Sequence, residues 1–228
     1  MDSIVNDKHE NRLALYTHFG LRLLVGISIA TFILSRNWES AINATFILIL
    51  MLTPSFLKKK YSIYLPLELD LAIVGFIFLS LYLGSLGDFY EKFPWWDVVL
   101  HFQSGLLLGV IGFVMIYVLN ERKSERLVMS PGFVSLFAVC FSLALSVLWE
   151  IYEYAVDSWF GFNMQETGLP DTMGDFIING ISAVIIALIG YVWMRRRQKI
   201  PFTPKILKKY SLEQQLEGDT KNFDKKDI

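Results

Sequence analysis

Hydrophobic residues of this 228-residue chain fall into six blocks, which short polar or turn-rich segments separate. A block of about 20 apolar residues is what a helix needs to cross the hydrocarbon core of a bilayer. The expected membrane-spanning helices cover residues 16–35, 41–57, 64–86, 95–119, 131–156 and 172–194. The second block is short and contains Asn43 and Pro54, so a chain of four or five helices with a re-entrant segment is the alternative.

Composition places the chain among integral membrane proteins. Hydrophobic residues make up 54% of it, more than in a typical soluble domain. We therefore expect an all-α, polytopic helical bundle with one transmembrane domain over residues 1–194 and a cytoplasmic tail of mixed charge over residues 195–228. Residues 1–15 are polar and no cleavage site follows them, so the first helix is expected to stay in the mature protein.

The distribution of charge predicts an N-in, C-in orientation in the cytoplasmic membrane. Lysine and arginine gather on alternate connections, which the positive-inside rule assigns to the cytoplasm. These residues are Lys8, Arg12, Lys58, Lys59, Lys60, Arg122, Lys123, Arg126 and Arg195 to Arg197. The opposite connections and the adjoining helix ends carry ten acidic residues but only Arg36 and Lys92 as cations. Such a face attracts cations and repels anions unless a metal or protons neutralise it.

Polar residues recur with helical spacing in the last three apolar blocks. Each stripe has three members, which are Asp97, His101 and Gly105, then Glu150, Glu153 and Asp157, then Asp171, Asp175 and Asn179. Ionisable groups are expensive inside a membrane, so their presence there indicates a function. The expected topology brings the three stripes to similar depths, opening toward the extracytoplasmic side.

Several carboxylates close together cannot all stay ionised in an apolar setting, so either a cation binds among them or some hold protons. Oxygen ligands with one imidazole suit Mg²⁺, Mn²⁺, Fe²⁺ or Zn²⁺ and do not distinguish between them. The predicted ligands of a divalent metal ion are Asp97, His101, Glu150, Glu153, Asp157, Asp171 and Asp175. In an enzyme, Glu150 or Glu153 would be the general base and His101 a ligand or proton shuttle.

Three functions remain open at this point. The leading hypothesis is a metal-dependent hydrolase or transferase acting on a lipid or envelope substrate, with membrane lipid and a lipid-linked or small-molecule substrate as partners. A transporter or permease could use the same carboxylates as a proton or cation relay. The polar groups could also only pin the helices together. A dyad of Ser104 with His101 lacks the Gly-x-Ser-x-Gly elbow, and the sequence contains no nucleic-acid-binding motif.

Some of these residues also have structural explanations. Asp171 can cap the last helix, and Gly105, Gly109 and Gly112 form a small-residue surface for helix packing. At the opposite side of the membrane, Arg22 is expected to pair with Glu68 or Asp70.

The runs PWWDVVLHFQSG, LWEIYEYAVD and LPDTMGDFIING resemble the motifs of uncharacterised bacterial membrane-spanning proteins of the YjdF type, which are remotely similar to VanZ-like proteins. The resemblance covers residues 90–190 and makes 90–194 the motif-bearing core, with residues 1–86 outside it. It implicates the three stripes together with Trp149, and gives Asn179, Gly105 and Trp149 supporting roles. It implies a multi-pass membrane fold but no particular activity.

Overall fold

A computed structural model describes residues 2–61, 67–121, 129–161, 164–165 and 167–197. All regular structure in this part of the chain is helical. The elements are α1 (Asp2–Leu34), α2 (Trp38–Tyr61), α3 (Leu67–Ile77), the π-helix η1 (Phe78–Leu86), α4 (Phe89–Lys92), α5 (Trp96–Glu121), α6 (Pro131–Phe160) and α7 (Leu169–Arg197). Six helical stretches are long and apolar enough to cross a membrane, which confirms the predicted fold class.

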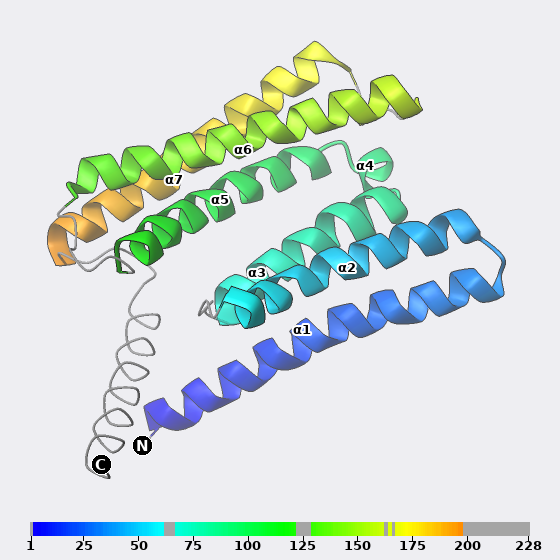
Figure 1. Ribbon diagram of the computed structural model, residues 1–228, viewed down its shortest axis with the longest axis horizontal. Helices are drawn as coiled ribbons and strands as arrows, with labels where there is room; N and C mark the ends of the chain where they lie inside the picture. Colours follow the sequence, from blue (N-terminus) through cyan, green and yellow to red (C-terminus); the bar gives the residue numbers. More distant parts are fainter. Residues whose placement is uncertain (1, 62–66, 122–128, 162–163, 166, 198–228) are drawn as a thin grey trace, which may run out of the picture.

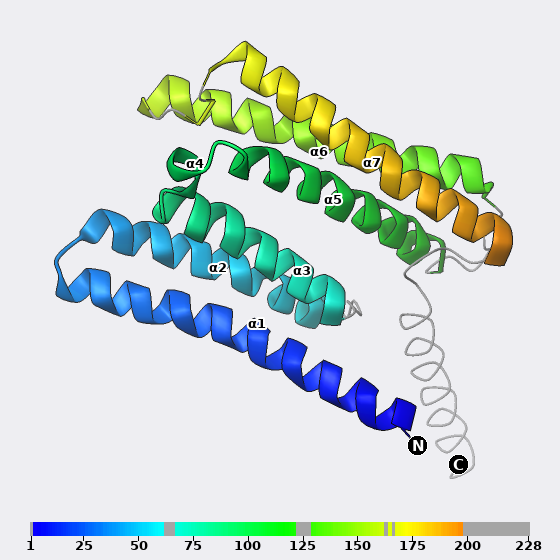
Figure 2. The same cartoon turned by 180° about the vertical axis from the view of Figure 1, so that it is seen from behind.

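The long helices lie side by side in two groups (Figure 1). Helices α1, α2 and α3 with η1 pack against one another, and α5, α6 and α7 form the second group. Contacts of α3 and η1 with α5 join the two groups, and the short α4 lies at the end where they meet, as the reverse view in Figure 2 also shows. The chain is therefore a single bundle built from two three-helix units.

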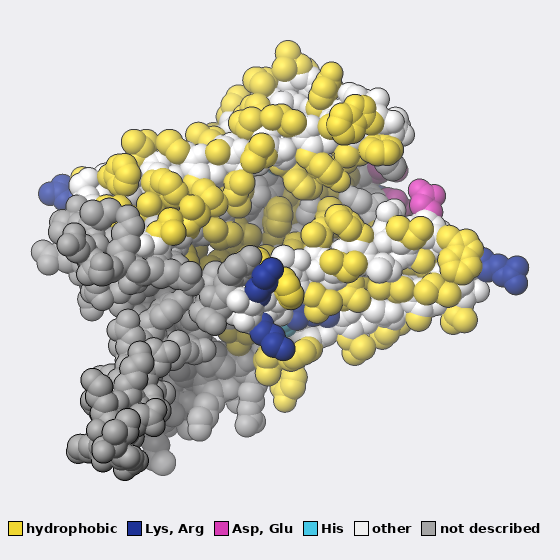
Figure 3. All heavy atoms as spheres, in the orientation of Figure 1, with side chains coloured by type: hydrophobic (Ala, Val, Ile, Leu, Met, Phe, Trp, Pro, Cys, Tyr) yellow, Lys and Arg dark blue, Asp and Glu magenta, His cyan; other side chains and the backbone are white. Residues whose placement is uncertain are grey.

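Hydrophobic side chains cover the sides of both groups, and charged side chains gather toward the helix ends (Figure 3). Leu148 and Ile177, for example, are 59% and 61% exposed near the middle of the chain's apolar spans. A surface of this kind is suited to contact with lipid rather than water. The orientation remains a prediction, and Arg122, Lys123, Arg126 and the tail beyond residue 197 lie outside the described residues.

The second apolar block forms one full-length span rather than a re-entrant segment. Helix α2 continues through Pro54, and its apolar stretch Trp38–Lys60 has 23 residues. Proline removes a backbone donor and disturbs the helix around it. Beside this position, the Arg22 guanidinium of α1 donates to the carbonyl of Met51 and, at 3.1 Å, to Ser55 Oγ. A neighbouring helix therefore donates hydrogen bonds to the turn of α2 that contains the proline.

Several helix ends differ from their predicted positions. Helix α1 begins at Asp2, well before residue 16, because the polar N-terminal segment continues the helix while the apolar span itself covers Leu15–Leu34. Helix α6 starts with Ser130 as its cap, whose Oγ accepts from the Phe133 amide at 3.2 Å. It ends at Phe160 rather than at the predicted residue 156, and its C-cap Gly161 has a φ of 71°, in the left-handed region that glycine adopts freely.

Glycines bring α5 and α7 into close contact. A Cβ atom on Gly105 would lie 1.9 Å from Ser182 Oγ and 2.6 Å from the Asn179 carbonyl oxygen, and one on Gly109 would lie 2.3 Å from Ile186 Cγ2. This confirms the packing role predicted for the glycines of α5. The close approach also determines the direction in which the polar residues that precede Gly105 on α5 face α7.

A buried ionic cluster links α1, α2 and α3. Asp70 Oδ2 lies 2.7 Å from Lys58 Nζ and 3.1 Å from His18 Nε2. Asp70 therefore pairs with these two groups rather than with the predicted Arg22, which binds the backbone of α2 instead. From the sequence alone Lys58 is only a topology signal, because its contact with Asp70 depends on how α2 packs against α3.

Candidate functional site

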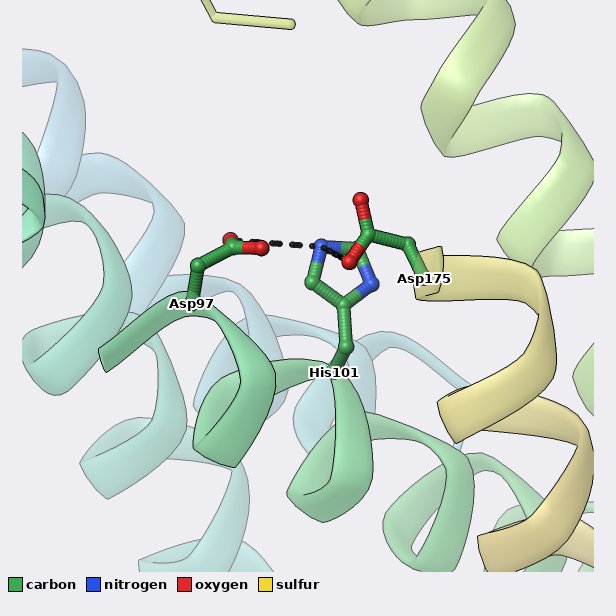
Figure 4. Close-up of side chains that lie close together, drawn as sticks. All are labelled: Asp97, His101 and Asp175. Atoms are coloured by element: carbon green, nitrogen blue, oxygen red, sulfur yellow. Dashed lines mark ion pairs between the residues drawn. The ribbon is translucent and has the colours of Figure 1, made fainter. Parts of the chain in front are cut away.

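Three potential metal ligands meet where α5 and α7 face each other. Helix α5 supplies Asp97 and His101, one turn apart, and α7 supplies Asp175. His101 Nε2 lies 3.4 Å from Asp97 Oδ1 and 3.8 Å from Asp175 Oδ1, so the imidazole stands between the two carboxylates (Figure 4). One ligand atom from each residue lies within 4.8 Å of the others. His101 and Asp175 are buried and Asp97 is half-buried.

Helix α6 brings two further buried carboxylates to this region. Glu153 Oε1 accepts a hydrogen bond from Trp149 Nε1 at 2.8 Å, so Trp149 orients this side chain. Glu150 is only 4% exposed, and neither of its oxygens makes a hydrogen bond of normal geometry, although the side chain of Thr172 lies nearby. A buried carboxylate without an opposite charge is costly, so Glu150 needs a proton or a cation to be stable there.

Asp157 and Asp171 are not members of the three-ligand group. The carboxylate of Asp157 accepts from the backbone amides of Met164 at 2.8 Å and Gln165 at 2.9 Å, and so closes the connection between α6 and α7. Helix α7 begins at Leu169, so Asp171 lies half-buried inside its first turn, and the prediction that Asp171 caps this helix is wrong. The seven predicted ligands thus fall into three sets. One is the compact three-ligand group, the second is the pair of glutamates on α6, and the third is Asp157 and Asp171 at the helix ends that flank the α6–α7 connection.

A hydrogen-bonded chain supports His101 from below. Asn179 Nδ2 donates to Ser104 Oγ at 3.0 Å, and Ser104 Oγ donates to the carbonyl of His101 at 2.9 Å. The Ser104 hydroxyl is therefore bound to backbone and amide groups rather than to the imidazole, which argues against a serine nucleophile activated by His101. Gly105 acts indirectly, by letting Asn179 and Ser182 approach α5.

Ser80 and Tyr90 form another wall of the site, and no sequence motif predicts them. Their hydroxyls are 3.0 Å apart, and η1 and α4 contribute them from the N-terminal side of the bundle. Burial raises the pKa of Tyr90 above its ordinary value, so the phenol stays protonated and can donate a hydrogen bond. The one local signal is Gly84, since a Cβ there would lie 2.4 Å from Tyr90 Cε2.

Two spaces adjoin the ligand group. An outer pocket of about 680 Å³ is lined by the acidic side chains of Asp88, Glu91, Asp97 and Glu153 among others. An inner cavity of about 290 Å³ has mainly apolar walls and reaches His101 at its polar side. Ser80, Tyr90 and Trp149 line both spaces. The arrangement can therefore hold a cation among its carboxylates next to an apolar cavity.

Comparison with known proteins places this architecture in a family. A family described as "Predicted membrane protein (DUF2238)" matches residues 16–196. A protein of Thermotoga maritima with the name "Uncharacterized protein" is 30% identical over 139 residues, which are 61% of this chain and 70% of that protein. No solved structure matches the chain. The family match begins in α1, so the expectation that residues 1–86 lie outside the resemblance is wrong. Because it covers most of the chain, the protein belongs to the DUF2238 family of predicted membrane proteins, the YjdF type that its three motifs indicated.

Proposed function

We propose that the protein is a divalent-metal-dependent enzyme of the cytoplasmic membrane, a hydrolase or transferase that acts on a lipid or envelope substrate from the extracytoplasmic side. One observation carries the proposal. Asp97, His101 and Asp175 offer ligand atoms within 4.8 Å of one another, and the buried Glu150 of α6 has two oxygens without a hydrogen bond of normal geometry.

The charge balance of the site favours a cation. Among the described residues, the ion pairs of Asp97 and Asp175 are with His101, which can supply at most one positive charge. Glu150 and Glu153 add further carboxylates from α6. Oxygen ligands and one imidazole form a donor set that divalent cations accept, and a bound cation would offset the repulsion between the acids.

Glu153 is the carboxylate best placed to act as a general base. It lines the outer pocket, where water and substrate can enter, and Trp149 holds one of its oxygens. A bound divalent ion would polarise the substrate and lower the pKa of a coordinated water. Glu153 would accept the proton of the attacking water, while Glu150 would complete the ligand set from the same helix.

Metal binding by the purified protein tests the proposal. After treatment with a chelator, the protein is titrated with Mn²⁺, Zn²⁺ and Mg²⁺ and its metal content is measured by mass spectrometry. We expect about one ion per chain, and at least a tenfold loss of affinity in His101→Ala and Asp175→Asn, because each removes a ligand.

Asp88→Asn is the matched control for these variants. Asp88 lines the outer pocket, but it is exposed and pairs with Lys92 at 3.6 Å. Its replacement should leave metal affinity unchanged. Absence of a bound ion in the unaltered protein, or an equal loss in Asp88→Asn, would contradict the proposed metal site.

The orientation of the site can be tested separately. In a protein with Cys140 replaced by alanine, Phe89→Cys should react with a membrane-impermeant thiol reagent in intact cells, whereas Ser124→Cys should react only after lysis. External labelling of Ser124→Cys would place the site on the cytoplasmic side and overturn that part of the proposal.

A transporter that uses the same carboxylates receives less support from the structure. Its relay would have to continue from the site toward the opposite side of the membrane. The buried polar groups that α6 and α7 place there are serines, and Ser142 and Ser182 donate to the carbonyls of Gly105 and Asn179. Proton or cation flux through reconstituted vesicles, abolished by Glu150→Gln, would favour the transporter over the enzyme.

A further inference from the structure

We infer that the inner cavity binds one hydrocarbon chain of a lipid, and that the polar group of this lipid lies in the outer pocket beside Asp97 and Glu153. This inference deepens the proposed function by naming the class of substrate, and it rests on that function only for the reaction that follows binding. Chain binding itself requires no metal and can be measured alone.

The size and lining of the inner cavity fit such a chain. Its volume of about 290 Å³ is roughly twice that of the ~150 Å³ apolar cavity that accepts benzene, so it has room for about twelve carbon atoms. Its apolar walls come from α3, α5 and α6 and include Ile73, Phe76, Leu107, Ile111 and Leu145. An apolar space of this size offers water few hydrogen-bond partners, so a hydrocarbon is the better occupant.

The polar groups of the cavity lie toward one side and make the occupant amphipathic. His101, Ser104 and Asn179 line the cavity and are joined by hydrogen bonds through Ser104. Beyond them, the outer pocket presents Asp97 and Glu153. A molecule that fills both spaces therefore has an apolar chain at one end and a polar group at the other.

Tyr90 and Ser80 lie where the chain would join the polar group. Both residues line the two spaces, and their hydroxyls are 3.0 Å apart. The protonated phenol of Tyr90 can donate to an oxygen of the lipid at this junction. We assign Tyr90 a positioning role, in which the N-terminal half of the bundle orients the substrate over ligands supplied by the C-terminal half.

The acidic ligands also predict that the preferred polar group of the lipid depends on whether a divalent ion is bound. Without a cation, the carboxylates around His101 repel a phosphate, whereas an uncharged glycerol ester avoids this repulsion. With a divalent ion bound, the same site attracts phosphate. Adding Mn²⁺ should therefore tighten binding of dodecyl phosphate but leave that of monododecanoylglycerol nearly unchanged.

Binding of single-chain lipids of graded length tests the inference. The metal-free protein in lipid nanodiscs is titrated with monoacylglycerols of 6 to 16 carbons, and binding is measured by native mass spectrometry. Affinity should rise with chain length up to about twelve carbons and then level off, because the cavity is full. Affinity that does not depend on chain length would overturn the inference.

Two substitutions on one helix provide the matched control. Leu145→Trp fills the cavity and should reduce the affinity for the twelve-carbon lipid at least tenfold. Leu148→Trp adds the same side chain to an exposed position of α6 outside the cavity and should leave the affinity unchanged. An equal loss in both variants would contradict binding in the cavity.

A third variant keeps the test valid if Leu145→Trp does not fold. Ile111→Ala enlarges the cavity and should move the levelling-off point to longer chains. Tyr90→Phe should weaken lipid binding severalfold without moving that point, because it removes a hydroxyl but leaves the cavity volume. An unchanged chain-length profile in Ile111→Ala would overturn the inference.

Metal and lipid measurements separate this inference from the proposed function. Asp175→Asn should lose the metal ion and keep the chain-length dependence in the metal-free state, because Asp175 is a proposed metal ligand that lines neither the inner cavity nor the outer pocket. If the unaltered protein binds no metal but shows the chain-length dependence, the proposed enzyme fails and the lipid site stands. If metal binds and no chain-length dependence is found, the lipid site fails and the proposed metal chemistry stands.

Discussion

The two halves of the bundle each contain a buried group of ionisable residues, and the two groups differ in charge balance. Between α1, α2 and α3, a single carboxylate, Asp70, faces Lys58 and His18. Between α5, α6 and α7, the carboxylates outnumber their cationic partners, and both oxygens of Glu150 lack a hydrogen bond. The carboxylate of the first group has its own cationic partner, whereas the carboxylates of the second group outnumber theirs.

This difference separates a structural cluster from a candidate binding site. A buried acid that has its own cation is satisfied in the folded protein, and loss of one partner exposes the cost of burying the other. Buried acids without enough cations raise the free energy of the folded state until protons or a metal ion arrive. Depth in the membrane alone would have marked both groups as functional, so the charge balance is the more informative criterion.

The largest effect on stability is expected in the N-terminal cluster. Asp70→Asn should lower the free energy of unfolding by about 3 kcal/mol, because it leaves the Lys58 ammonium without its carboxylate. Reversible unfolding in mixed micelles measures the change. The double variant Asp70→Leu with Lys58→Met should recover much of the loss. Additive losses would show that the two residues do not act as a pair.

A smaller effect is expected where glycine packing holds the C-terminal site together. Gly105→Ala should cost about 1–3 kcal/mol, since the new methyl group would lie 2.6 Å from the Asn179 carbonyl, which cannot rotate away. Metal affinity should fall in parallel. Gly174→Ala on α7 is the control, because nothing lies within 4 Å of its Cβ position, and it should be neutral or slightly stabilising.

The smallest effect on stability is expected at the unpaired acid itself. In the metal-free protein, Glu150→Gln should change the free energy of unfolding by less than about 1 kcal/mol, because glutamine is a neutral group of nearly the same size as a protonated glutamate and neither Glu150 oxygen makes a hydrogen bond of normal geometry. The same variant should bind the divalent ion more weakly. Destabilisation as large as that of Asp70→Asn would mean that Glu150 is a structural partner and that the contrast between the two clusters is false.

The sequence by itself determined the six spans and the polar stripes on three of them. Each apolar block is long enough to cross a bilayer, and the free energy of moving it into lipid depends on its own residues. The spacing of Asp97 and His101 likewise placed both on one side of a helix without knowledge of its neighbours. Such properties are local, so they can be predicted before the helices are packed.

Only the tertiary structure decided what each acid contacts. Asp157 lies on the same face of α6 as Glu150. Its carboxylate accepts hydrogen bonds from the amides of Met164 and Gln165, whereas neither oxygen of Glu150 makes a hydrogen bond of normal geometry. Tyr90 enters the site because η1 and α4 lie against α5. Hydrogen bonds and ion pairs act over a few ångströms between segments far apart in the chain, so their partners follow from helix packing rather than from local sequence.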